Sequence, residues 1–178
     1  MNASKRQWRR PFDYSNVPRR ERSYILAAML LWSVLSFILI STFVLRGAEV
    51  VGPSMRPTLH DGDRFIMYRW TFHVREPARG DIVALRLPWF DDLTVKRIVA
   101  LPGETVLVSN NSVMVDHHTL HEPYIAPGSY TMPGPVLGRP LKVPKGHYIV
   151  LGDNREQSYD SRTFGPVDRS WIVGYVPR

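Results

Sequence analysis

The chain has 178 residues, a net charge of +7 and no cysteine. Its length favours a single domain, and the lack of cysteine excludes disulfides, thiolate zinc sites and a cysteine nucleophile. Residues 1–22 hold seven Lys or Arg against two Asp or Glu, so five of the seven net charges lie in this N-terminal segment. Because the rest of the chain is nearly neutral, we predict no nucleic-acid partner.

An uncharged apolar segment follows at residues 23–45. As a helix it would be about 34 Å long, enough to cross a hydrocarbon core of about 30 Å. A cleaved signal peptide is the alternative, but its apolar stretch should be about 7 to 15 residues and end in small residues. We therefore predict one transmembrane helix in a lipid bilayer. The positive charge before it predicts that residues 1–22 are cytoplasmic and residues 46–178 exported.

Short β-type segments separated by turn residues occupy most of residues 46–178. They are 64–68, 81–87, 93–100, 105–108, 112–115, 147–151 and 171–176. Such segments between turns that contain Gly and Asp are typical of antiparallel β-structure. Residues 122–144 contain six prolines, too many for a central strand. We predict an all-β domain, either a sandwich or a coiled antiparallel sheet, with a small inserted subdomain or excursion at about 116–146.

Ser54 and Lys96 are the candidate nucleophile and base. A serine hydroxyl needs a neighbouring base, and none of the six histidines lies in a segment that indicates one. At its ordinary pKa about one lysine in 2,500 is neutral at pH 7, so Lys96 must be desolvated to act. Strand alternation places Ile98 and Ala100 on its face, which favours an apolar surrounding. An isolated strand lysine usually reaches solvent, but the Ser54 motif before it and polar residues 152–162 after it favour the catalytic interpretation.

Five segments in a fixed order carry a resemblance to a known family. They are Ser54-Met55-Arg56-Pro57-Thr58-Leu59, Gly80-Asp81-Ile82-Val83, Lys96-Arg97-Ile98-Val99 with Leu101-Pro102-Gly103-Glu104, Glu122-Pro123-Tyr124, and Gly152-Asp153-Asn154-Arg155 with Ser158, Asp160-Ser161-Arg162 and Gly165. The chain resembles the type I signal peptidases of the serine/lysine class, membrane-anchored enzymes that remove signal peptides from exported proteins. The resemblance covers the anchor and nearly all of the domain after it.

This resemblance implies a coiled antiparallel β-sheet catalytic domain held at the plasma (inner) membrane, acting on secretory preproteins. It implies that Ser54 is the nucleophile, that Lys96 is the general base, and that Ser158 hydrogen-bonds to the Lys96 amine and orients it. Cleavage is expected after small residues, alanine-like at the first and third positions before the cut. The resemblance implies no metal and no cofactor.

The resemblance also implies supporting residues. Asp160 and Arg162 match an ion pair that supports the site, which Arg97 is expected to join. For Asp153 we favour a structural role, because a carboxylate paired with Lys96 would raise the pKa of the base. Many members have a serine two positions before the nucleophile as a second oxyanion donor. Here that position is Gly52, which can form a tight turn or let the backbone approach substrate, and the second donor stays open.

Met55 and Pro53 are expected to line the substrate cleft, with Met55 as an apolar rim. Residues 116–122 have the composition of a metal site, but a hairpin turn explains them and we predict no metal. One alternative function is a specialised relative, such as a pilin-maturation or organellar inner-membrane peptidase. Another is a non-catalytic, membrane-anchored β module that binds extended peptides.

Overall fold

The computed structural model describes residues 18–43 and 45–177. Residues 1–17, most of the predicted cytoplasmic tail, therefore lie outside the described residues. The chain divides between Ile40 and Ser41 into two compact units, which are described separately.

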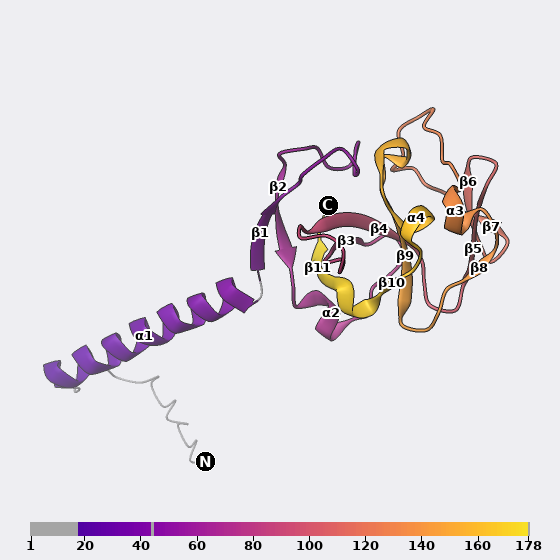
Figure 1. The fold of residues 1–178 in the computed structure, drawn as a ribbon. Helices are drawn as coiled ribbons and strands as arrows, with labels where there is room; N and C mark the ends of the chain where they lie inside the picture. The colour runs from indigo at the N-terminus through magenta and orange to yellow at the C-terminus, as the bar shows by residue number, and fades with distance from the viewer. Residues whose placement is uncertain (1–17, 44, 178) are drawn as a thin grey trace, which may run out of the picture. The chain divides into compact units, whose positions relative to one another are not determined.

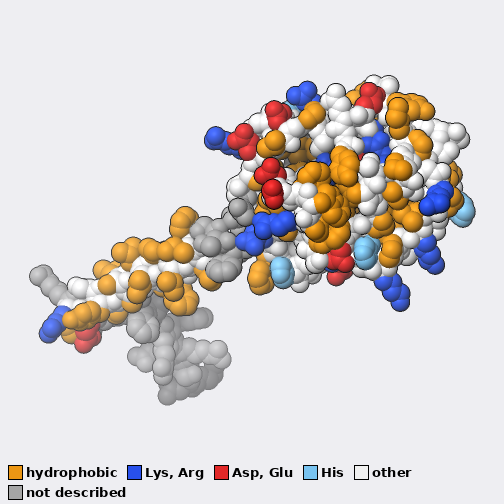
Figure 2. All heavy atoms as spheres, in the orientation of Figure 1, with side chains coloured by type: hydrophobic (Ala, Val, Ile, Leu, Met, Phe, Trp, Pro, Cys, Tyr) orange, Lys and Arg blue, Asp and Glu red, His pale blue; other side chains and the backbone are white. Residues whose placement is uncertain are grey.

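The first unit is dominated by helix α1, Arg19–Phe43. The predicted segment was 23–45, so the helix begins four residues earlier and ends two residues earlier than predicted. Leu45 belongs to a strand. Residues Arg20–Leu39 have a mean hydropathy of 1.7, and apolar side chains cover α1 (Figure 2). In the described part of the chain, one helix is long and apolar enough to cross a membrane.

The second unit contains two antiparallel sheets (Figure 1). The larger sheet has the order β1-β2-β11-β3-β4-β9-β10. Its strands are β1 (Leu45–Glu49), β2 (Arg64–Tyr68), β3 (Ile82–Leu85), β4 (Thr94–Ala100), β9 (His147–Leu151), β10 (Val167–Asp168) and β11 (Ile172–Val176). This sheet is open, with β1 and β10 as its edges. The predicted all-β class with a coiled antiparallel sheet is confirmed.

The smaller sheet has the order β7-β6-β5-β8 and lies with α3 at one end of the domain (Figure 1). Its strands are β5 (Thr105–Ser109), β6 (Ser112–Val115), β7 (His118–Thr119) and β8 (Leu141–Lys142). The short helices are α2 (Thr71–Val74), α3 (Gly134–Leu137), α4 (Ser161–Phe164), η2 (Arg155–Gln157) and η3 (Arg169–Trp171). The smaller sheet begins before the predicted excursion at 116–146, because β5 and β6 belong to it.

Strand β4 carries Lys96 between β3 and β9, inside the larger sheet. Lys96 pairs across the strands with Val83, which shares an apolar cluster with Ile98. The predicted alternation of faces along β4 does not continue to Ala100, because the register of β4 with β9 shifts between Ile98 and Ala100. Ala100 accordingly packs in a different apolar cluster.

Candidate active site

The Ser54 hydroxyl and the Lys96 amine are in direct contact, although 42 positions separate them in the sequence. Lys96 Nζ donates to Ser54 Oγ at 2.9 Å and to the Val95 carbonyl at 3.1 Å. The first distance lies within the range of about 2.6 to 3.2 Å that proton transfer to a base requires. An uncharged amine at this position can accept the hydroxyl proton.

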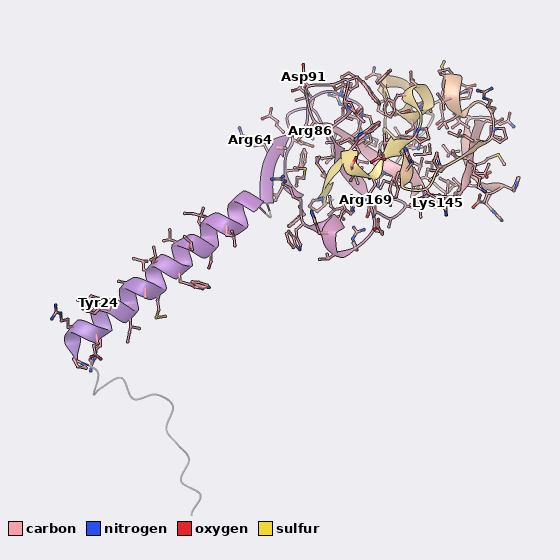
Figure 3. The ribbon with its side chains drawn as sticks, turned by 60° about the horizontal axis from the view of Figure 1, so that its bottom comes forward. Tyr24, Arg64, Arg86, Asp91, Lys145 and Arg169 are labelled. Carbon is pink, nitrogen blue, oxygen red and sulfur yellow. The ribbon has the colours of Figure 1, made fainter. Side chains whose placement is uncertain are left out.

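Lys96 is buried, with 4% of its surface exposed. Other cations, such as Arg86 and Lys145, extend outward from the domain and are exposed (Figure 3). Burial, which disfavours the charged amine, is the main reason that the pKa of Lys96 falls from 10.5 to about 8. Asp160 opposes this fall in pKa and Arg162 assists it. About one Lys96 amine in ten is then neutral at pH 7.

The loop that carries Ser54 is attached to the segment after β9. The backbone N–H of Asn154 donates to the Ser54 carbonyl at 3.0 Å, and the Asn154 side-chain amide donates to the Pro53 carbonyl at 3.2 Å. Gly52 enters the loop with φ +89°, a left-handed conformation that favours glycine. Its N–H donates to Asp61 Oδ1 at 2.6 Å, so Gly52 forms a turn here.

A buried ion pair joins Arg97, next to the base, to Asp153. Arg97 Nε and Nη2 donate to the two Asp153 oxygens at 2.8 and 2.6 Å, and the Thr58 hydroxyl donates to the same carboxylate. Arg97 also donates to the Gly80 carbonyl at 2.8 Å. The pair thereby fixes the serine loop, β4 and the 152–154 segment to one another. Asp153 pairs with Arg97, as a structural role requires, and its charge also raises the pKa of Lys96, by less than that of Asp160 does.

A second buried ion pair joins Asp160 to Arg162 in the bidentate form. The two oxygens accept from Arg162 Nε and Nη2, both at 2.9 Å, and Asp160 Oδ2 also accepts the Gly152 N–H at 3.1 Å. Arg162 Nη2 donates in addition to the Arg155 carbonyl at 2.7 Å. This pair therefore fixes the backbone on both sides of Ser158.

Ser158 lies close to Gly152 and to the Ser54 backbone, but its hydroxyl does not make the expected hydrogen bond to Lys96. Its buried hydroxyl has no hydrogen-bond partner among the described residues. A Cβ atom added to Gly152 would overlap both the Ser158 hydroxyl and the Ser54 carbonyl, so glycine allows the two segments to come together. Sequence reasoning did not select Gly152 as a site residue, because its contribution is the absence of a side chain.

The sequence profile of the family described as signal peptidase, peptidase S26, matches residues 22–177. The chain belongs to this signal peptidase family. It is similar to a probable signal peptidase I-2 of Synechocystis, with 41% identity over 84% of this chain and 69% of that protein. It is also similar to a signal peptidase I of Bacillus amyloliquefaciens, with 35% identity over 93% of this chain and 89% of that protein.

A crystal structure of a signal peptidase I from Enterococcus faecalis V583 has a related fold, with a TM-score of 0.50 and 32% identity. The match covers 58% of this chain and 98% of that chain. These comparisons confirm the predicted family. They identify the chain as a serine endopeptidase.

Besides the missing Ser158 hydrogen bond, two further details expected from the resemblance differ in the structure. Met55, expected to form an apolar rim of the substrate cleft, is 1% exposed and packs in an apolar cluster with Met67 and Ile82. Its neighbour Pro53 is half-buried. Arg97 does not join the Asp160 pair, because its Nε and Nη2 donate to Asp153 and its Nη1 donates to the Gly80 carbonyl.

Proposed function

We propose that the chain is a membrane-anchored serine endopeptidase that removes signal peptides from exported preproteins, with Ser54 as nucleophile and Lys96 as general base. The observation that carries the proposal is the 2.9 Å hydrogen bond between the buried Lys96 amine and the Ser54 hydroxyl. Family membership supports the substrate class, because the named relatives are signal peptidases.

The reaction begins when neutral Lys96 takes the Ser54 proton. Ser54 Oγ then attacks the scissile carbonyl carbon, and the Ser54 backbone N–H donates to the oxygen that becomes negative. The Lys96 ammonium returns its proton to the leaving amine, which frees the mature protein and leaves the signal peptide as an ester of Ser54. Lys96 next takes a proton from water, the hydroxide attacks the ester, and the proton returns to Ser54.

The substrate binds in an extended conformation beside strand β1. Among the described strands β1 pairs only with β2, so its other edge can accept a peptide by β-augmentation. The strand ends at Glu49, five residues before the nucleophile. This position supports a substrate whose residues before the cut pair with β1 and end at Ser54. The first and third residues before the cut carry small side chains.

Incubation of the full-length chain in detergent with a secretory preprotein tests the function. We expect release of the mature N-terminus, and no cleavage of a matched preprotein that has Trp in place of Ala immediately before the cut. Failure on ordinary preproteins, with cleavage of a pilin precursor, would favour the specialised-relative alternative. Cleavage at unrelated sites would contradict the proposal.

Cleavage should increase with pH. Below its pKa Lys96 is protonated and cannot accept the Ser54 proton, so kcat/KM should fall about tenfold per pH unit below a midpoint near 8 and level off above it. The measurement is kcat/KM for a preprotein or peptide between pH 6 and 10. A rate that stays constant from pH 6 to 9 would remove the titration of Lys96 from the mechanism.

Helix α1 spans the membrane once in this proposal, with the basic N-terminus in the cytoplasm and residues 46–178 on the exported side of the plasma membrane. The apolar surface of α1 and the seven cations of residues 1–22 support this orientation. Protease added to sealed, inside-out vesicles should remove the tail and leave the β domain intact. Digestion of the β domain in intact vesicles would contradict the proposed topology and place this domain on the cytoplasmic side.

A further inference from the structure

Two consecutive carbonyl groups, those of Pro53 and Ser54, accept hydrogen bonds, whereas the Ser54 N–H between them has no acceptor among residues 18–43 and 45–177. The Pro53 carbonyl accepts from the Asn154 amide at 3.2 Å and from the Arg56 N–H at 3.1 Å. The Ser54 carbonyl accepts from the Asn154 backbone N–H at 3.0 Å. The Ser54 N–H donates to no acceptor among the described residues. One residue, Asn154, therefore holds the peptide groups on both sides of Ser54.

The Pro53–Ser54 peptide is planar and trans, so its C=O and N–H bonds point in opposite directions. A donor that fixes the Pro53 carbonyl therefore also fixes the direction of the Ser54 N–H. We propose that Asn154 is a positioning residue that holds the Ser54 N–H in the direction in which it donates to the reaction oxyanion. This inference rests on the proposed function, in which Ser54 attacks a peptide carbonyl.

The surroundings of Asn154 make it a firm support. The preceding residue, Asp153, is held in the buried pair with Arg97, and the Asn154 carbonyl accepts the Gln157 N–H at 3.2 Å in η2. Apart from this support, the side-chain amide makes a longer contact with Gln157 Oε1, at 3.4 Å. Aspartate, which has nearly the same shape, could not replace Asn154, because a carboxylate has no N–H to donate to the Pro53 carbonyl.

The orientation of this single N–H is important here because Gly52 has no hydroxyl that could act as a second donor. A preorganised donor stabilises charge that develops only in the transition state, so its loss lowers kcat and leaves substrate affinity unchanged. Removal of an entire oxyanion donor lowers kcat about 10²- to 10³-fold. In an Asn154 variant the donor remains but its direction is less restricted, so we expect a smaller loss.

The test compares Asn154→Ala and Asn154→Leu in the full-length chain with the parent and with Gln157→Ala. Both Asn154 variants remove the side-chain donor and keep the backbone bond to Ser54, and leucine also keeps the approximate size. We expect kcat to fall about 10- to 100-fold, KM to stay within about twofold, and the pH midpoint to match the parent. Gln157→Ala removes only the longer contact and should retain parental kcat.

Several outcomes would overturn this role for Asn154. The first two are a parental kcat in both Asn154 variants and a rise in KM at constant kcat. The third is a shift of the pH midpoint, which would mean that the substitution acts through Lys96. The fourth is a fall in kcat that disappears once the rate is corrected for the fraction of folded protein. In each of them the parent still cleaves preproteins, so the proposed function is unaffected. An inactive parent would contradict the proposed function and this inference together.

Discussion

Replacement of Ser54 by alanine is expected to lower kcat for preprotein cleavage about 10⁶-fold, the loss seen when the nucleophile of a serine protease is removed. The substitution removes the only atom that can form the acyl ester. The fold should persist, because within the described part of the chain Ser54 Oγ makes one hydrogen bond, to Lys96, worth about 1 kcal/mol. The measurements are single-turnover cleavage and the midpoint of thermal unfolding.

Ser170, an exposed serine in η3, supplies the matched control. Ser170→Ala should cleave at the parental rate. Continued cleavage by Ser54→Ala would exclude Ser54 as the nucleophile. A parent that binds signal peptides without cleaving them, and a Ser54→Ala variant that binds them equally well, would favour the non-catalytic module.

Replacement of Lys96 by methionine or by arginine should lower kcat by about 10³-fold or more, since either change removes the base. Methionine keeps the linear shape but has no amine. Arginine keeps the charge, but its guanidinium does not release a proton in proteins. The two variants together separate the loss of charge from the loss of a titratable amine. Cleavage at a rate near that of the parent in either variant would remove Lys96 from the mechanism.

The same substitutions should affect stability in a predictable direction. A fall in pKa from 10.5 to about 8 means that burial of Lys96 reduces the free energy of unfolding by about 3 kcal/mol at pH 7. Lys96→Met should therefore unfold at a higher temperature than the parent. Between pH 8 and 10.5 the unfolded chain binds more protons at Lys96 than the native chain, so parental stability should rise with pH in that window.

The control for this prediction is Lys142→Met, which changes an exposed lysine in β8. It should alter neither cleavage nor the pH dependence of stability. A Lys96→Met variant that unfolds at a lower temperature and keeps the parental pH dependence of stability would contradict the depressed pKa.

The regular strands could be predicted because their residues carry a local signal. Residues 64–68, 112–115 and 147–151 match β2, β6 and β9 in their bounds, because each segment is mostly aliphatic or aromatic and lies between turns. Strand β1 was not predicted, since its sequence, Leu-Arg-Gly-Ala-Glu, has no β-branched residue and begins at Leu45, the last residue of the predicted apolar segment. β7, β8 and β10 are two residues long, too short for a periodic pattern.

The partners within the site were harder to predict than its members. Asp153 and Asp160 lie in one polar segment, and the resemblance led us to expect Arg97 at the Asp160 pair, whereas the structure pairs Arg97 with Asp153. The choice depends on the register of β4 against β9, which places Arg97 opposite Leu151, two residues before Asp153. Gly152 allows Ser158 and the Ser54 backbone to approach each other, and Asn154 donates to the Pro53 carbonyl. Neither role depends on a pattern of residue types, so the sequence does not indicate it.

The sequence by itself determined the family, the apolar segment with its charged flank, the antiparallel β class and the two residues proposed for the chemistry, Ser54 and Lys96. These are local patterns of residue type and order. Only the tertiary structure decided that Lys96 is buried, that its amine donates to the Ser54 hydroxyl, and that Asn154 donates to the Pro53 carbonyl in the serine loop. The physical reason is that the pKa and direction of a group depend on the atoms around it, and here those atoms come from residues that lie up to about 100 positions apart in the chain.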